Sequence, residues 1–201
     1  MAVNLQKGQK VDLTKGNAGL NALMIGLGWD EAPQPKKGLF GGLFSGSKQE
    51  DIDCDASAIL LTNGKMTSNQ DIVYYGNLSH PSGSVEHQGD NLTGAGEGDD
   101  EQIMVTLDKV PARCDKIVFV VNIYQAVPRK QHFGMIKNAY IRIVNAKNGQ
   151  ELCKYDLSEN YDGKTAIIVG EVYRHDSEWK FSAIGQATND PGLQELIRRY
   201  I

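Results

Sequence analysis

The chain has 201 residues, of which 25 are acidic and 21 are Lys or Arg, and its formal net charge is −4. This length allows one substantial hydrophobic core or at most two small domains, and we favour a single domain over residues 1–201. The acidic balance argues against a general nucleic-acid binder, because neutralising phosphates requires a basic surface.

Two features of the sequence indicate the cellular compartment. The first ten residues lack the apolar stretch of a signal peptide, and no run approaches the length needed to span a bilayer. The three cysteines, Cys54, Cys114 and Cys153, lie far apart without a CxxC spacing, and an odd number cannot all pair within one chain. We therefore expect a soluble protein of the reducing cytoplasm.

Strand-like runs dominate the chain and alternate with short Gly, Asn, Asp and Pro segments, a spacing typical of an all-β sandwich or barrel. The predicted strands are 11–14, 20–27, 56–61, 71–75, 103–107, 116–124, 139–144, 152–156, 165–173 and 179–185. The run 116–124 is apolar on nearly both faces, so we predict that it is a central strand. His175-Asp176-Ser177 separates two β-rich runs and predicts a hairpin turn.

One segment has a convincing helical pattern, and it is the last. Asp190 is the predicted N-cap, and Pro191 fits the first turn. The apolar residues recur at the spacing of one helix face, which we expect to pack against the sheets: Leu193, Leu196, Ile197, Tyr200 and Ile201.

An insertion at about residues 33–50 breaks the β pattern with Pro, Gly and Ser. We interpret it as a long, flexible, exposed loop. The apolar residues of Leu39–Phe44 lie close to Lys36, Lys37 and Lys48, a composition that suits peripheral contact with an anionic membrane or a partner. A loop whose Phe side chains fold back onto the domain is the favoured alternative, because a Gly-rich segment offers no stable amphipathic helix.

Acidic residues are concentrated in one part of the chain. Residues 51–108 hold eleven acids and one basic residue, Lys65, whereas the rest holds 20 basic and 14 acidic residues. In an extended segment, Asp51, Asp53 and Asp55 would point to the same face, and two carboxylates at such spacing repel by about 1 kcal/mol. A divalent cation would turn this repulsion into attraction, although a solvated strand edge is an alternative.

A second acidic cluster, at residues 89–101, combines Gly with Asp, Asn, Thr and Glu. Its glycines let a short loop curl so that side-chain and carbonyl oxygens converge, and calcium takes about six to eight such oxygens. Neither cluster has the spacing of an EF-hand, and the lack of His and of a suitably oriented Cys argues against zinc and copper. A simply solvated acidic loop remains an alternative.

Enzymatic motifs are incomplete. The segment 41–48 approaches a P-loop, but Ser47 stands at the Lys position. Gly94, Gly96 and Gly98 form GxGxG without a following helix, and there is no GxSxG nucleophile motif. We therefore expect a protein that is not an enzyme.

Several motifs together resemble the TerD family of tellurium-resistance and stress proteins. They are GLGWD at 26–30, DIDCDAS at 51–57, SGSVEHQGDNLTG at 82–94, GDDE at 98–101, FGMIKNAYIR at 133–142, YDLS at 155–158 and GEVYRH at 170–175. The resemblance extends from Val3 to about Gln186. The insertion is longer than the family pattern, and Gly76 stands where the family tends to carry Asn.

The resemblance implies an all-β sandwich of two mainly antiparallel sheets with long acidic loops at one end and a short C-terminal helix. It also implies bound Ca²⁺, and the number of carboxylates suits two ions. The ligand candidates are Asp30, Asp51, Asp53, Asp55, Asp90, Asn91, Thr93, Gly94, Glu97, Asp99, Asp100 and Glu101.

Three functions are compatible with these patterns. In the first, calcium orders the acidic loops into a surface that docks other stress-response proteins, including members of the same family, and so supports resistance to tellurite and other stresses. In the second, the chain binds a small anionic metabolite or oxyanion through Arg129, Lys130, Lys137 and Arg142. In the third, the Leu39–Phe44 loop makes it a calcium-dependent scaffold on a membrane or partner.

Overall fold

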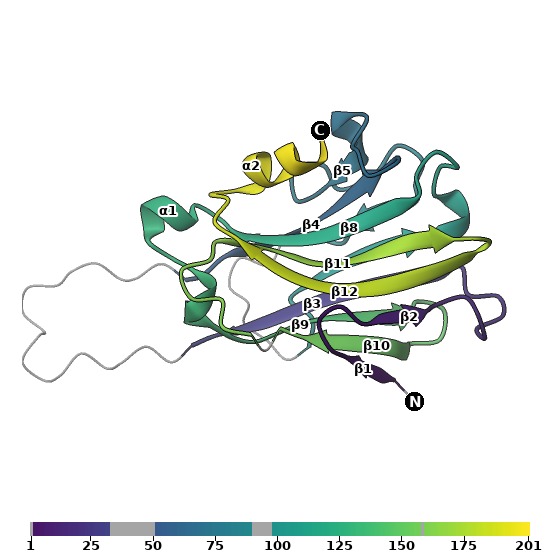
Figure 1. The fold of residues 1–201 in the computed structure, drawn as a ribbon, viewed down its shortest axis with the longest axis horizontal. Coiled ribbons are helices and arrows are strands. Elements are labelled where there is room, and N and C mark those ends of the chain that lie inside the picture. The colour runs from purple at the N-terminus through teal and green to yellow at the C-terminus, as the bar shows by residue number, and fades with distance from the viewer. Residues whose placement is uncertain (1, 33–50, 90–97, 158) are drawn as a thin grey trace, which may run out of the picture.

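The computed structural model describes residues 2–32, 51–89, 98–157 and 159–201. They form two six-stranded sheets packed face to face (Figure 1). The first sheet has the order β1 (Val3–Leu5), β10 (Gln150–Asp156), β9 (Ile136–Asn145), β3 (Ala22–Glu31), β7 (Glu101–Thr106), β6 (Val85–His87). The second has the order β2 (Lys10–Asp12), β12 (Glu178–Thr188), β11 (Ala166–His175), β8 (Lys116–Ile123), β4 (Cys54–Leu61), β5 (Ile72–Val73).

Pairing is antiparallel except between β1 and β10, so the predicted all-β sandwich of mainly antiparallel sheets is confirmed. Short helical segments connect the strands: α1 (Ala126–Arg129), α2 (Leu193–Ile197), and the 3-10 turns Asn69–Asp71, Leu107–Lys109, Phe133–Met135 and Arg198–Tyr200.

Alternation along the strands builds the core between the sheets. Ile25 and Leu27 of β3 point inward from the first sheet, and Leu60 of β4 and Phe119 of β8 meet them from the second. Residues of opposite parity reach the outer faces. On the second sheet, the part of this outer face that α2 covers is also apolar.

The predicted central strand is confirmed. β8 lies between β11 and β4, and its residues from Ile117 to Ile123 are buried. Val118 and Val120 pack outward against Leu196 of α2, which explains why both faces of the strand are apolar. The hairpin at His175-Asp176-Ser177 is also confirmed, since His175 pairs with Glu178 across a two-residue loop.

The start of the C-terminal helix differs from the prediction. The helix begins at Leu193 with Gly192 as its N-cap, and Pro191 precedes it. Asp190 does not cap the helix, because its carboxylate accepts a hydrogen bond from Arg199, with 2.8 Å between Arg199 Nη2 and Asp190 Oδ2. The predicted packing is confirmed for Leu196, which is fully buried, whereas Ile201 is exposed.

Two predicted features lie outside the described residues. These are the insertion at 33–50, with its Leu39–Phe44 contact, and the loop residues 90–97. Within the described ranges, no helix combines the length and the apolar character needed to cross a membrane.

Candidate metal centre

Three hydrogen bonds bring the acidic segments to one end of the sandwich. The Asp100 amide donates to the Leu27 carbonyl at 2.8 Å, and the Trp29 amide donates to Asp100 Oδ2 at 2.7 Å. The Ala56 amide donates to Glu101 Oε2 at 2.6 Å, which joins β4 of the second sheet to β7 of the first. The end of β3 and the starts of β4 and β7 therefore meet.

Asp100 lies where negative charge accumulates. Burial raises the pKa of its carboxyl, and the nearby carboxylates of Asp30 and Asp99 raise it further, while the hydrogen bond from Trp29 opposes them. Asp30 is exposed on β3, and its Oδ2 accepts a hydrogen bond from Asn138 Nδ2 at 2.8 Å. A cation near Asp100 would relieve this repulsion.

Glu101 points into the interior rather than toward solvent. It is 2% exposed, and its Oε2 lies 3.4 Å from Nε2 of the buried His87. The His87 ring also accepts a hydrogen bond from the Gly89 amide at Nδ1, just before the loop 90–97. Glu101 thus links both sheets to the start of the acidic loop.

Asp99 is held on the outer face of the first sheet by a two-point ion pair. Arg142 donates from Nε to Oδ1 at 2.7 Å and from Nη2 to Oδ2 at 2.9 Å, and the Tyr140 hydroxyl donates to Oδ1 at 3.1 Å. The carboxylate lies directly over Gly26, where any Cβ would collide with it. Burial and the Asp99 charge raise the pKa of Tyr140, and the hydrogen bonds to Asp99 raise that of Arg142.

The first acidic cluster is divided by exposure. Asp51 is exposed, whereas Asp53 and Asp55 are 8% and 5% exposed. Asp55 accepts a hydrogen bond from Asn122 Nδ2 at 3.2 Å on the outer face of the second sheet. Cys54 points the opposite way into the core, as predicted, and burial together with the surrounding carboxylates raises the pKa of its thiol.

The described residues supply the oxygen donors that a hard cation prefers, at one end of the fold. Within the described ranges, however, no three His, Cys, Asp or Glu side chains stand together as a metal-binding group. The candidates Asp90, Asn91, Thr93, Gly94 and Glu97 lie outside those ranges. The donor chemistry fits calcium, and a full coordination shell would need these loop residues.

Comparison with known protein families gives a match over almost the whole chain. The TerD domain family matches residues 1–200. The chain belongs to the TerD family. The resemblance inferred from the sequence motifs is thereby confirmed.

Curated TerD-family relatives align over the full length. The chain is 55% identical to stress response protein SCP2 and 50% identical to general stress protein 16U, both of Bacillus subtilis, over 100% of this chain and 100% and 97% of theirs. It is 44% identical to tellurium resistance protein TerD of Serratia marcescens over 100% of this chain and 97% of that protein.

Solved structures support the fold. A homologue of telluride resistance protein (TerD) from Streptomyces coelicolor superposes with a TM-score of 0.60 and 20% identity, covering 85% of this chain and 92% of that one. A protein of unknown function superposes with a TM-score of 0.64 and 24% identity, covering 85% and 91%. Both superpositions cover 85% of this chain and support the observed fold.

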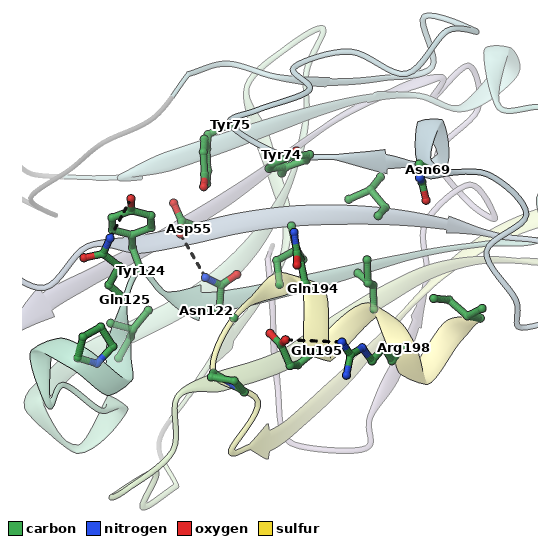
Figure 2. A pocket seen from close by; sticks show the side chains of 18 residues that line it. Asp55, Asn69, Tyr74, Tyr75, Asn122, Tyr124, Gln125, Gln194, Glu195 and Arg198 are labelled. Carbon is green, nitrogen blue, oxygen red and sulfur yellow. Dashed lines mark hydrogen bonds and ion pairs between the residues drawn. The ribbon is translucent and has the colours of Figure 1, made fainter.

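A groove of about 720 Å³ lies beside the acidic end, and the sequence alone did not reveal it (Figure 2). It runs over the outer face of the second sheet, between α2 and the segment that follows β5. Tyr74 and Tyr75 line one side, and Tyr124 lies at one end. The pair of adjacent aromatic residues at 74 and 75 is the one sequence feature that could have indicated this groove. Gly76 lies against the Tyr74 ring, and a Cβ added at Gly76 would come within 2.6 Å of Tyr74 Cε2.

Proposed function

We propose that this TerD-family protein is a calcium-binding, non-enzymatic stress-response protein whose acidic end forms a docking surface when the ion is bound. The observation that carries the proposal is the set of three hydrogen bonds that bring the acidic segments of β3, β4 and β7 together. The stress-response and tellurium-resistance names of its relatives favour a role in resistance to tellurite and other stresses.

The contacts at this end rank the ligand candidates. Asp30 and Asp100 lie near each other at the end of β3, where an ion would relieve the repulsion between them. Asp99 already gives both oxygens to Arg142, and Glu101 accepts from the Ala56 amide. The carboxylates of Asp53 and Asp100 both act on the Cys54 thiol, which places them at the same end of the sandwich. We therefore assign Asp30, Asp53 and Asp100, together with loop residues 90–97, as the principal ligands of two calcium ions. Asp99 and Glu101 position the strands next to which these ligands lie.

A bound calcium ion would supply the positive charge that neutralises the carboxylate oxygens around it. The chain's own residues supply the framework: the Trp29 amide orients Asp100, and the Ala56 amide holds Glu101 so that the two sheets keep a fixed spacing. Without a cation, the acidic segments repel one another. With it, they adopt one arrangement, which another stress-response protein, including a member of the same family, can recognise.

Calorimetric titration of metal-free protein with calcium and with magnesium tests the proposal. Binding to the folded state alone stabilises it by about 2.7 kcal/mol at a hundredfold excess over Kd. For a chain of this size that corresponds to a rise in Tm of about 5 to 10 °C. A Tm that neither calcium nor a chelator changes would refute it.

A pair of matched variants localises the effect. Asp100→Asn removes one charge from the acidic end, and we expect at least a tenfold loss in calcium affinity, about 1.4 kcal/mol. Asp176→Asn removes one charge from the β11–β12 hairpin at the other end of the sandwich (Figure 1). Asn tolerates the left-handed conformation at this position, where φ is 57°, so this control should bind calcium as the unmodified protein does.

A further inference from the structure

We infer that the groove beside α2 is a binding site for a small organic cation that carries a primary ammonium group. Its volume of about 720 Å³ lies within the range of small-molecule sites. The inference goes beyond the calcium proposal, because it concerns a different ligand on the outer face of the second sheet. Asp55, a calcium-ligand candidate in the sequence analysis, lines this groove and is not among the principal calcium ligands assigned above.

A side-chain oxygen at the floor of the groove lacks a hydrogen-bond donor among the described residues. Asn122 is 4% exposed, and its Nδ2 donates to Asp55, which fixes the orientation of the amide. Its Oδ1 is buried and accepts no hydrogen bond from the described residues. A buried acceptor without a donor is unfavourable, and a ligand N–H group would supply the missing hydrogen bond. Figure 2 shows this amide beside Asp55 within the groove.

The charge of the lining selects a cation. Asp55 and Glu195 are the acids among the described residues that line the groove, and Arg198 is the one cation among them. Arg198 Nη2 lies 3.9 Å from Glu195 Oε1, so that positive charge is already matched. An anionic ligand would meet the Asp55 carboxylate next to the acceptor oxygen of Asn122.

The aromatic side of the groove fits the same ligand class. Tyr74 and Tyr75 pack edge to face with 5.3 Å between ring centroids, and Tyr75 and Tyr124 do so at 6.5 Å. Ring faces attract ammonium and guanidinium groups, and the chain already places the Arg129 guanidinium 5.1 Å from the centroid of Tyr124. Tyr75 is 44% exposed, a large exposure for an aromatic residue that lines a groove.

Gly76 determines where the Tyr74 ring lies. Its lack of a side chain lets the Tyr74 ring lie against the backbone, and a Cβ at this position would come within 2.6 Å of Tyr74 Cε2. Gly76→Ala should therefore displace the ring without changing any charge in the groove.

Calorimetric titration of metal-free protein with spermidine tests the inference, in about 0.15 M salt to screen diffuse attraction. We expect one saturable site. Spermidine that is fully methylated to quaternary ammonium at all three nitrogens keeps the triple charge and has no N–H donor, so it should bind at least about tenfold more weakly. Tyr75→Leu and Gly76→Ala should each weaken spermidine binding by about tenfold. The matched control is Tyr173→Leu, because Tyr173 lies on β11 outside the groove and should leave the affinity unchanged.

The outcomes separate this inference from the calcium proposal. Absence of saturable spermidine binding would overturn the inference and leave calcium binding untouched. Equal affinity in Tyr75→Leu, Tyr173→Leu and unmodified protein would overturn it too, since spermidine would then be spread over the acidic surface. Displacement of spermidine by calcium with no effect of Tyr75→Leu would assign Asp55 to the metal site and also overturn it.

Discussion

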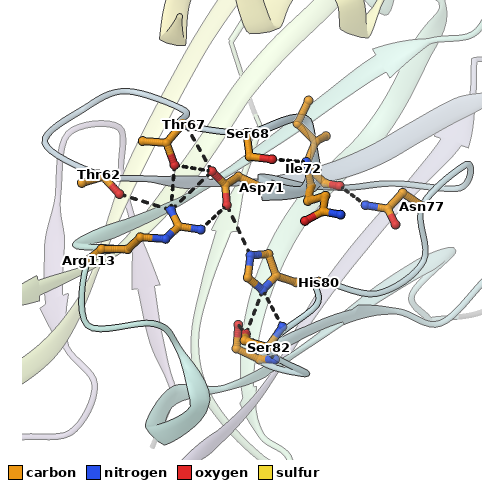
Figure 3. A network of polar contacts seen from close by, with 11 residues as sticks. Thr62, Thr67, Ser68, Asp71, Ile72, Asn77, His80, Ser82 and Arg113 are labelled. Atoms are coloured by element: carbon orange, nitrogen blue, oxygen red, sulfur yellow. Dashed lines mark hydrogen bonds and ion pairs between the residues drawn. The ribbon is translucent and has the colours of Figure 1, made fainter.

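The Arg113 guanidinium binds the fully buried carboxylate of Asp71, with 2.6 Å between Arg113 Nη2 and Asp71 Oδ1 (Figure 3). The same carboxylate accepts hydrogen bonds from the hydroxyl and amide of Thr67 and lies 3.3 Å from His80 Nε2. Asp71 therefore connects the segment after β4, the segment after β5 and the loop before β8. These contacts hold the base of the segment that carries Tyr74 and Tyr75.

Arg113→Ala should lower the free energy of unfolding by about 3 kcal/mol, because it removes the main charge partner while Asp71 stays buried. Arg198→Ala is the control. Arg198 is 73% exposed and its ion pair is long, so we expect a change within about 0.5 kcal/mol. Urea unfolding at pH 7 measures both, and equal midpoints for the two variants would contradict the prediction.

Protonation of Asp71 at low pH should lower the free energy of unfolding. Burial raises the pKa of Asp71, but the hydrogen bonds from Arg113, Thr67 and His80 outweigh it and bring the pKa to about 2, below the ordinary 3.8. A folded-state pKa below the unfolded one gives stability that is complete above the ordinary value and is lost as pH falls toward 2. The contribution is roughly 2 kcal/mol.

Asp71→Asn isolates this effect, because the amide does not titrate. Between pH 5 and pH 2, the unfolding free energy of the unmodified protein should fall by roughly 2 kcal/mol more than that of the variant. Urea unfolding at a series of pH values gives the two slopes. Parallel slopes would show that other carboxylates cause the acid loss.

The elements predicted correctly are those whose signals are local or strongly periodic. The β11–β12 hairpin depends on the chemistry of two adjacent residues, Asp176 and Ser177. β8 was predicted because burial on both faces leaves a continuous apolar run. The edge strands β1 and β6 were missed, since each has three residues and is stabilised by pairing with β10 or β7 rather than by its own pattern.

The candidate site shows the same limit. The sequence grouped the acids by proximity along the chain, and the fold does bring the described segments to one end. It could not indicate that Asp99 is bound by Arg142, 43 residues later, or that Asp190 would pair with Arg199 instead of capping α2. Such pairs depend on the register between strands or on packing, and counting charges along the sequence gives no information on either.

Leu196→Ala should destabilise the chain by about 3 kcal/mol, because Leu196 is fully buried between α2 and the outer face of the second sheet. The neighbouring Gln194→Ala keeps the helix and removes a groove-lining polar side chain, so we expect a change within about 0.5 kcal/mol. Thermal and urea unfolding compare the two. A small effect of Leu196→Ala would mean that α2 contributes little to the fold.

Gly26→Ala tests the role of Asp99. The new methyl group would occupy the position of the Asp99 carboxylate, so Asp99 and its bonds to Arg142 must move, at a cost of about 1 to 3 kcal/mol. Gly192→Ala is the control, because its nearest contact would be an ordinary 3.8 Å to Glu195. Since we assign Asp99 a positioning role, Gly26→Ala should lower Tm but change calcium affinity by less than about threefold, or about 0.7 kcal/mol. A loss of calcium affinity in Gly26→Ala as large as in Asp100→Asn would instead make Asp99 a ligand, exchanged from Arg142 to the ion.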